Sequence, residues 1–405
     1  MQRILLSDLN NGMITAEDVF SVDGQLIVPK GIALTENLIA RLFSFDIFSI
    51  KVEDEVLKST ATDKDLIQIS YAEKLKASPE YQEFKEEFKE GMQFYKMLQF
   101  LFFKQWRELK AYANENGIKI IGDVPIYVAY DSCDVWANPN EFYLNNLREP
   151  IDVAGCPPDA FSADGQLWGN PLFRWDNMKN NGYDWWTKRI SAMSKLYDIV
   201  RIDHFRGFDS YFAIPANETT AKNGEWRQGP GMDLFRVLEQ KLGKLPIIVE
   251  DLGFLTPSVK QLLEDSGFPG MKVIQFAFDS REETNYLPHT YTNHCVVYTG
   301  THDNDTVVGW LKTAPKKAIA YAKEYLQLTE EEGYNWGLMR AAWASVADMA
   351  IIPMQDLLEL GSEARLNTPS SFGSNWKWRA TEDQITNDLA KKICKYAKLY
   401  GRFNG

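Results

Sequence analysis

Cysteine and histidine are both scarce in this 405-residue chain, which contains four of each. The four cysteines lie far apart and form no pair separated by two residues: Cys133, Cys156, Cys295 and Cys394. Structural zinc sites and disulfide frameworks depend on cysteines at short, regular spacings. The sequence therefore predicts neither a disulfide scaffold nor a metal site.

Long apolar runs and an excess of positive charge are also missing. No window approaches the roughly 18 apolar residues of a membrane span, and the N-terminus lacks the apolar core of a signal peptide. The net charge of -12 argues against a nucleic-acid-binding surface, because such surfaces need basic patches to meet phosphate. We therefore expect a soluble, cytoplasmic protein that binds neither nucleic acid nor membrane.

The chain does contain enough apolar sequence, 45% of its residues, for a substantial core. From residue 118 onward, short apolar runs typical of buried strands alternate with helical patterns such as 257–265 and 316–327. The candidate strands are 118–124, 198–203, 246–250, 272–278, 295–299 and 350–354. This alternation predicts an α/β fold with a parallel sheet. A (β/α)8 barrel fits better than a doubly wound sheet, because no glycine-rich phosphate loop follows any strand, although a barrel has eight strands and we find six.

Three acidic residues each follow one of these apolar runs: Asp203, Glu250 and Asp303. A carboxylate at the carboxyl end of each of several strands is how a parallel barrel assembles an active site. Taken singly, an acidic residue at a strand end is as well explained as the N-cap of the next helix. Three of them on different strands, with Arg201 and His302 beside them, favour a catalytic cluster.

The neighbours of these carboxylates suggest different protonation states. Arg201 precedes Asp203 by two residues, on the same face of the strand, and its positive charge would keep Asp203 ionised. Glu250 has no cation in its own segment, and Asp251, if it faced the same cavity, would raise the pKa of Glu250. A retaining glycosidase needs one ionised and one protonated carboxyl group. His302, beside Asp303, is placed to hydrogen-bond a sugar hydroxyl.

Aromatic residues support the same interpretation with less specificity. Twelve tryptophans are many for this length, and indole rings stack on the apolar faces of sugars. Trp168, between Gln166 and Asn170 in a glycine-rich stretch, is the best candidate for such a platform. We expect Trp106, Trp310 and the pair Trp185 and Trp186 to belong to the core.

From about residue 94 to the C-terminus the chain resembles the amylomaltase family of 4-alpha-glucanotransferases, also called disproportionating enzymes. The motifs that carry the resemblance follow one another in the family's order: Gly122-Asp123-Val124-Pro125-Ile126-Tyr127, Gly165-Gln166-Leu167-Trp168-Gly169-Asn170-Pro171, Arg201-Ile202-Asp203-His204-Phe205-Arg206-Gly207, Glu250-Asp251-Leu252-Gly253, Thr301-His302-Asp303-Asn304-Asp305-Thr306, Ala364-Arg365-Leu366-Asn367-Thr368-Pro369 and Asn375-Trp376-Lys377-Trp378-Arg379.

The resemblance implies a retaining transfer of α-1,4-glucan segments between maltooligosaccharides, without a cofactor. It assigns Asp203 as the nucleophile, Glu250 as the general acid and base, and Asp303 as the carboxylate that stabilises the transition state. It implies contacts with the substrate for Arg201, His302, Asp123, Trp168 and Asn367. Asp123 has an alternative role as a turn or cap residue. The motifs of the cluster alone do not separate a transferase from a hydrolase, and the wider resemblance makes that distinction.

The N-terminal part departs from the family. Residues 1–60 predict a small mixed module that resembles the leader module ahead of HD-GYP phosphodiesterases, and 61–93 predict a charged helix or linker. Residues 94–405 then form the catalytic barrel without its first two strands. Open barrel edges expose unpaired strands, which predicts a homodimer through these edges and reduced or lost activity.

Two other functions compete with the transferase. One is a catalytically impaired protein that still binds glucans. The other is a chimeric protein whose N-terminal module has a regulatory role.

Overall fold

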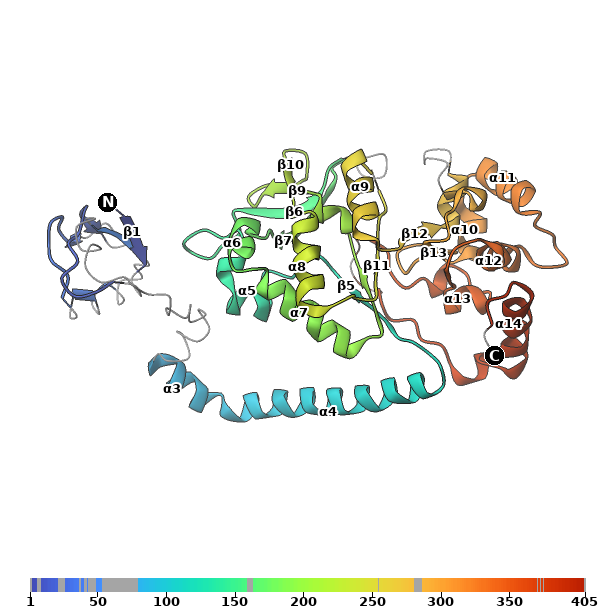
Figure 1. Ribbon diagram of the computed structural model, residues 1–405, viewed down its shortest axis with the longest axis horizontal. Coiled ribbons are helices and arrows are strands. Elements are labelled where there is room, and N and C mark those ends of the chain that lie inside the picture. Colours follow the sequence, from blue (N-terminus) through green and yellow to red (C-terminus); the bar gives the residue numbers. More distant parts are fainter. Residues whose placement is uncertain are drawn as a thin grey trace.

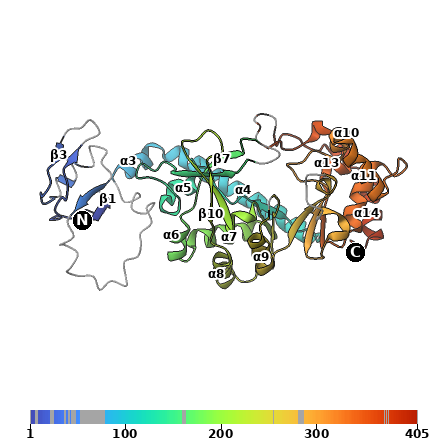
Figure 2. The same cartoon turned by 90° about the horizontal axis from the view of Figure 1, so that it is seen from above.

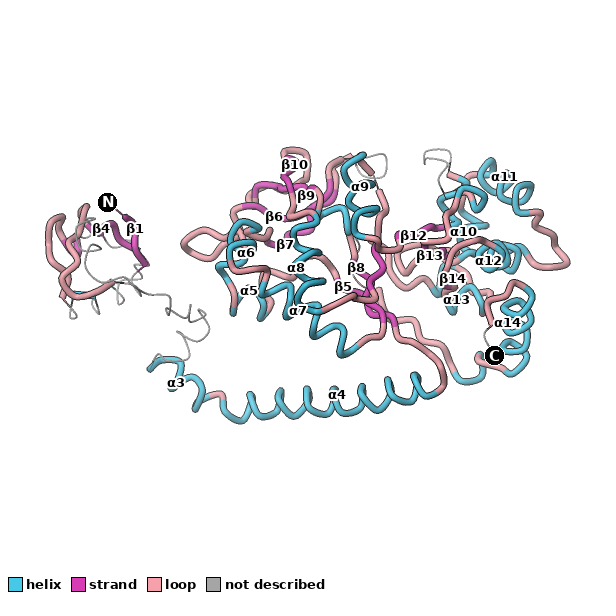
Figure 3. The backbone as a smooth tube through the Cα atoms, in the orientation of Figure 1, coloured by secondary structure: helices cyan, strands magenta, loops and turns pink. Residues whose placement is uncertain are grey.

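The computed structural model describes residues 2–5, 9–20, 26–35, 38–39, 42, 49–52, 79–158, 163–253, 255–279, 286–369, 371, 373 and 375–403. Figure 1 shows a small group of N-terminal strands, a long helix α4 and a larger α/β body. Figure 2 gives the view from above, and Figure 3 separates helices from strands by colour.

Six parallel strands form the centre of the body: β5 (Ile121–Val124), β8 (Ile199–Ile202), β11 (Ile247–Val249), β12 (Gly270–Val273), β13 (Cys295–Tyr298) and β14 (Met349–Ile351). They make two three-stranded sheets, in the orders β5-β8-β11 and β12-β13-β14. The sheets adjoin where the Val249 N–H donates to the Pro269 carbonyl over 3.0 Å. The predicted α/β architecture with six parallel strands is therefore confirmed, and β5 and β14 are the outer strands within the described residues.

One predicted strand is too long. The interval 272–278 contains strand only to Val273, and Ile274–Phe278 forms a 3-10 helix, η5. The Gln275 side-chain amide donates to the Asp305 carbonyl over 2.9 Å, which ties this 3-10 helix to the loop after β13.

Helices connect the strands: α5 (Cys133–Ala137), α6 (Trp175–Asn180), α7 (Asp184–Leu196), α8 (Met232–Leu242), α9 (Pro257–Ser266), α10 (Val307–Thr313), α11 (Lys316–Leu326), α12 (Tyr334–Ala344), α13 (Met354–Leu357) and α14 (Asn387–Leu399). Helix α9 shows why its sequence forms this element. Thr256 caps the helix by accepting from the Val259 N–H, Pro257 occupies the first turn, and Gly267 ends it at φ 63°. The helices predicted at 257–265 and 316–327 are both confirmed.

An antiparallel sheet that the sequence did not predict is inserted between the parallel strands. Its order is β10-β9-β6-β7, with β6 (Asp152–Cys156), β7 (Gln166–Pro171), β9 (Ser210–Pro215) and β10 (Glu225–Gln228). These strands are short and include glycine and proline, which weakens the alternation that identifies a strand. The sheet matters for the site because β7 carries Trp168.

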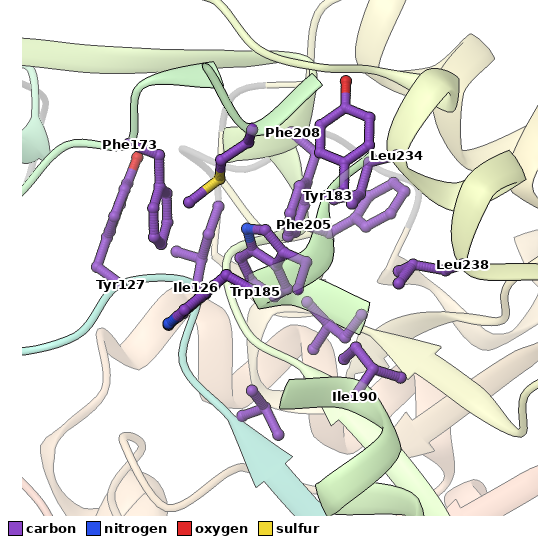
Figure 4. Packing of buried hydrophobic residues seen from close by; sticks show 14 of the residues in the cluster. Ile126, Tyr127, Phe173, Tyr183, Trp185, Ile190, Phe205, Phe208, Leu234 and Leu238 are labelled. Atoms are coloured by element: carbon purple, nitrogen blue, oxygen red, sulfur yellow. The ribbon is translucent and has the colours of Figure 1, made fainter. Parts of the chain in front are cut away.

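Aromatic side chains dominate the core beside this sheet. Figure 4 shows Phe205, Phe208 and Trp185 among the buried residues of this cluster. Trp186 is fully buried, so the prediction that Trp185 and Trp186 belong to the core is confirmed. Trp310 is partly buried and packs against a second core cluster around Val297.

The described N-terminal residues form two small antiparallel pairs. β1 (Gln2–Leu5) pairs with β4 (Ser49–Val52), and β2 (Val19–Phe20) pairs with β3 (Leu26–Val28). Their core contains Leu9, Met13, Val19, Val28, Leu34, Leu42, Ile50 and Val52.

Two helices precede the body, α3 (Pro79–Glu87) and α4 (Lys89–Glu115). None of the residues of α4 is buried. Trp106 is therefore not a core residue as predicted, but it is half-buried and its Nε1–H donates to the Leu196 carbonyl over 2.9 Å. In the part of the chain that the structure describes, no helix is long and apolar enough to cross a membrane.

Candidate active site

The first two predicted carboxylates lie at the ends of adjacent strands. Asp203 directly follows β8, and Glu250 directly follows β11. Their backbones are held in register, because the Asp203 N–H donates to the Val124 carbonyl over 3.0 Å and the Glu250 N–H donates to the Ile202 carbonyl over 2.9 Å. The parallel register therefore places both side chains at the same end of the sheet.

Arg201 links two of the predicted residues. Its Nη1 donates to both carboxylate oxygens of Asp123, at 2.7 and 2.6 Å, and to Asp203 Oδ1 at 3.1 Å. The guanidinium is nearly buried, whereas the Asp123 and Asp203 side chains keep 43% and 42% of their surface exposed. Asp123 thus faces the site from β5, and its partner is a side chain rather than the backbone of a turn or cap.

Backbone amides hold the Glu250 carboxyl group from two sides. Oε2 accepts from the His204 N–H over 2.8 Å, and Oε1 accepts from the Leu252 N–H over 2.6 Å. His204 can aim its N–H this way because it adopts a left-handed conformation, with φ 51°. Burial, followed by the negative charge of Asp203, raises the pKa of Glu250 from 4.5 to about 7. The fixed carboxyl group can therefore hold a proton near neutral pH.

The removal of water from around the carboxyl group changes the expectation for Asp203, although the side chain keeps 42% of its surface exposed. It raises the pKa of this carboxyl group above its usual value, and the Arg201 charge opposes that rise without cancelling it. The charges of Asp123 and Asp303 add to the rise in the pKa of Asp203. Arg201 does favour the ionised form of Asp203, as predicted, but it is not the largest influence.

Asp251 does not share the cavity with Glu250. It is buried, and its Oδ1 accepts from the Met271 N–H on β12 over 2.6 Å. Among the causes that raise the pKa of Glu250, the Asp251 charge follows burial and the Asp203 charge. The Asp251 charge thus raises the pKa of Glu250, as expected, but it acts from a buried position and is a smaller cause than burial or Asp203.

The third carboxylate, Asp303, lies in the loop after β13. Asn367 holds it, because its Nδ2 donates to Asp303 Oδ1 over 2.6 Å and its N–H donates to the His302 carbonyl over 3.1 Å. Arg365 Nη2 donates to the Asp303 carbonyl over 2.6 Å, and His302 Nε2 lies 3.5 Å from Asp303 Oδ2. Asn367 thus supports the loop of Asp303, and Arg365 is a supporting residue that sequence reasoning missed although it lies in a quoted motif.

A cavity of about 460 Å³ opens at this end of the sheet. Its lining includes Arg201, Tyr298, His302, Gln355, Arg365 and Trp378. The exposed ring of Trp376 lies 5.1 Å from the His302 ring, between centroids. Trp376 and Trp378 belong to the last quoted motif, so the signal was in the sequence, but only the fold brings this segment to the cavity.

Trp168 lies on a different side of the cluster. Its ring meets the His204 ring edge-on at 4.9 Å, and its Nε1–H donates to Gln166 Oε1 over 3.0 Å. The ring is half-buried and locked by this bond, next to the residue that donates to Glu250. Among the described residues, no three His, Cys, Asp or Glu side chains are grouped closely enough to hold a metal ion.

Comparisons with known proteins bear on the family of the chain. The sequence model of the family described as 4-alpha-glucanotransferase matches residues 54–385. The chain is similar to a 4-alpha-glucanotransferase of Clostridium butyricum, at 53% identity over 81% of the chain and 68% of that protein. It is also similar to one from Streptococcus pneumoniae, at 48% identity over 79% of the chain and 64% of that protein.

Solved structures give the same result. An amylomaltase from Streptococcus agalactiae in complex with acarbose superposes with a TM-score of 0.79 at 40% identity, covering 82% of this chain and 67% of that one. An amylomaltase from Corynebacterium glutamicum, at 19% identity and a TM-score of 0.61, shares the fold. The chain thus spans about two thirds of the length of these two curated relatives and of the Streptococcus agalactiae structure.

Proposed function

Because the chain belongs to the 4-alpha-glucanotransferase family, we propose that it transfers α-1,4-glucan segments between maltooligosaccharides by a retaining double displacement. The observation that carries the proposal is the pair Asp203 and Glu250 on adjacent strand ends, with the pKa of Glu250 raised to about 7. One carboxylate that attacks and one carboxylic acid that donates a proton are the two groups this mechanism requires.

In the first step, an Asp203 oxygen forms a bond to the anomeric carbon as the glycosidic bond breaks. Glu250 gives its proton to the leaving oxygen, so the shortened glucan departs with a hydroxyl group. In the second step, the ionised Glu250 takes the proton from the 4-hydroxyl of an acceptor, whose oxygen replaces Asp203 on the anomeric carbon. Two inversions at this carbon give net retention.

The other predicted residues have supporting roles in this proposal. Arg201 neutralises the two acidic groups on either side of it, Asp123 and Asp203, so that Asp203 can ionise near Glu250. Asp303 faces the oxocarbenium-like charge that develops on the sugar, and His302 and Trp168 contact its hydroxyls and ring face. Asn367 keeps Asp303 in place.

Transfer is distinguished from hydrolysis by labelled acceptor. When the protein acts on unlabelled maltotriose in the presence of radiolabelled glucose, the proposal predicts label in maltooligosaccharides that Asp203→Asn does not form. Unlabelled products with a rising count of reducing ends would identify a hydrolase instead.

A second function, glucan binding with impaired catalysis, is favoured by the outer strand β5, which carries Asp123 at the edge of the sheet. Calorimetric titration with acarbose separates the two. Glucan binding with impaired catalysis predicts the same affinity for the wild type and Asp203→Asn, with no labelled transfer product from either.

Three sequence predictions stay predictions. They are the resemblance of residues 1–60 to an HD-GYP leader module, the cytoplasmic location, and the homodimer through open barrel edges. The homodimer predicts a solution mass twice the 46.4 kDa of one chain.

A further inference from the structure

The loop that carries Asp303 is held at both ends by one buried carboxylate. The loop runs from Thr299, directly after β13, to Val307, the first residue of α10, and Asp303 lies midway between them. Asp356 Oδ2 accepts from the Thr299 hydroxyl over 2.7 Å, and Asp356 Oδ1 accepts from the Val307 N–H over 2.7 Å. The two oxygens of a single side chain therefore join the two ends of the loop.

Asp356 itself is buried beside the cavity. It is 1% exposed on α13, which is separated from β14 by two residues (Figure 3). Its carbonyl accepts from Asn335 Nδ2 on α12 over 3.4 Å. The preceding residues, Met354 and Gln355, line the cavity of about 460 Å³. Because Asp356 is buried, it can act on a substrate in this cavity only through the residues that it contacts.

Hydrogen bonds inside the loop connect its ends to Asp303. The Thr301 N–H and hydroxyl both donate to Asn304 Oδ1, over 2.8 and 2.9 Å, and the Asp303 N–H donates to Thr301 Oγ1 over 3.2 Å. The loop is therefore a hydrogen-bonded turn. A shift of either end would move this turn, and the Asp303 carboxylate with it.

The ionised form of Asp356 suits its two partners. Burial raises the pKa of Asp356 to about 6, the hydrogen bonds from Val307 and Thr299 oppose that rise, and the charge of Asp305 adds to it. At neutral pH the group is mostly ionised, and each oxygen accepts from one donor. Hydrogen bonds to a carboxylate are stronger than those between neutral groups.

A helix cap alone does not account for this arrangement. The Val307 N–H belongs to the first turn of α10, where an acidic side chain is often a cap. Thr306 already caps α10, because its hydroxyl accepts from the Gly309 N–H over 3.1 Å. The second oxygen of Asp356 reaches Thr299, at the other end of the loop. Asp356 therefore bridges the loop in addition to satisfying the helix.

We propose that Asp356 is a positioning residue for Asp303, and that it acts through its hydrogen bonds to Thr299 and Val307. This inference rests on the proposed function, in which Asp303 faces the charge that develops on the sugar. Such stabilisation requires groups that are already in place, and a misplacement of about 1 Å can cost about 10²-fold in rate. Loss of the two hydrogen bonds would therefore lower kcat without removing any group that touches the sugar.

The test combines changes at positions 356 and 303 in a double-mutant cycle, with fluoride release from α-maltosyl fluoride as the measured rate. We expect Asp356→Ala to lower kcat about 10–100-fold in the wild type but less than about threefold in Asp303→Asn, which has already lost the group that is positioned. Asp152→Ala is the matched control, because Asp152 is also a buried carboxylate but pairs with Arg227 on the antiparallel sheet. Its effect on kcat should be the same factor in both backgrounds.

Two further variants separate the hydrogen bonds from the charge and from folding. Asp356→Asn should keep kcat within about threefold, because its oxygen can accept from the Val307 N–H and its amide can donate to the Thr299 hydroxyl oxygen. Thr299→Val keeps the side-chain volume and removes one bond, so it tests the proposal even where Asp356→Ala does not fold. We expect it to lower kcat about 3–10-fold.

Equal losses from Asp356→Ala with and without Asp303, or a loss in Asp356→Asn as large as that in Asp356→Ala, would overturn the proposal. Hydrogen exchange gives a readout that does not need activity. The amides of residues 301–304 should exchange faster in Thr299→Val, while those of β8 and β11 stay unchanged, and unchanged exchange in the loop contradicts the proposal. Faster exchange of the loop, together with a wild type that releases no fluoride, upholds the positioning of the loop and contradicts the proposed function.

Discussion

Arg201 and Asp203 face the same side of the sheet two residues apart, and Arg201 Nη1 donates to Asp203 Oδ1 over 3.1 Å. The same nitrogen donates to both oxygens of Asp123 over shorter distances. Asp203 therefore shares its cation with a second carboxylate, whose negative charge raises the pKa of Asp203. The pH at which Asp203 ionises therefore depends on burial first, and then on the opposing charges of Arg201 and Asp123.

This balance gives a prediction for Asp123→Asn. Removal of the Asp123 charge lowers the pKa of Asp203, so the acidic limb of the profile of kcat/KM against pH moves to lower pH. The acidic limb is measured for the wild type and the variant on the same maltooligosaccharide. Asp131→Asn, at an exposed position near the end of β5, is the control and leaves the limb in place. A limb that moves upward in Asp123→Asn would contradict the assigned coupling.

The pKa of Glu250 predicts the alkaline limb of the profile of kcat/KM against pH. Its protonated form is the general acid, so glucan transfer falls as the pH rises through about 7. Glu250→Gln lowers the rate on maltooligosaccharides about 10²–10⁴-fold. With α-maltosyl fluoride, whose leaving group needs no proton, the first step in Glu250→Gln keeps its rate and loses the alkaline limb. Equal losses on both donors would show that Glu250 is not the acid.

The raised pKa of Glu250 also predicts how the free energy of unfolding of Glu250→Gln, relative to that of the wild type, changes with pH. The pKa of Glu250 in the folded protein, about 7, lies above its ordinary value of 4.5. The favourable contribution of this group to the free energy of unfolding is therefore fully present below pH 4.5, where it is protonated, and is lost as the pH rises through about 7. Between pH 4 and pH 8, the free energy of unfolding of Glu250→Gln therefore rises by about 3 kcal/mol relative to that of the wild type, on top of a cost at both pH values from one backbone N–H that the Gln amide nitrogen cannot accept. Urea denaturation at the two pH values measures the difference. An equal effect at both would mean that the change acts through packing instead of ionisation.

Trp376 predicts an effect on substrate binding. Its exposed ring beside His302 offers a stacking face at the rim of the cavity. Trp376→Ala should raise KM about 3–10-fold and leave kcat within twofold, as expected for loss of one stacking contact. Trp136→Ala is a matched control, because Trp136 has the same exposed fraction of 52% and lies on α5. A larger fall in kcat than in affinity would assign Trp376 to the chemical step.

Much of this site could be predicted from sequence because Asp203 and Glu250 directly follow apolar runs and Asp303 comes a few residues after a third. The runs before Asp203 and Glu250 are nearly uniform in branched aliphatic residues, which identify buried parallel strands without ambiguity. Because the carboxyl ends of adjacent parallel strands lie at the same edge of the sheet, the two acids come together whatever the course of the segment that connects the strands. The six parallel strands follow from the same signal.

Other features depend on tertiary packing that no local pattern specifies. The orientation of Asp251 toward Met271 depends on β12, which lies beside β11 only in the folded protein. The approach of Asn367 and Trp376 to the loop of Asp303 joins segments more than 60 residues apart. The exposure of α4 could not be predicted either: we expected Trp106 in the core, but none of the residues of this helix is buried.

The most direct test of the account is the action of the purified protein on maltotriose, with Asp203→Asn in parallel. The account predicts glucose and a ladder of oligosaccharides longer than maltotriose from the wild type, and neither product from Asp203→Asn. The same products from the wild type and Asp203→Asn, or no ladder from the folded wild type, would contradict it.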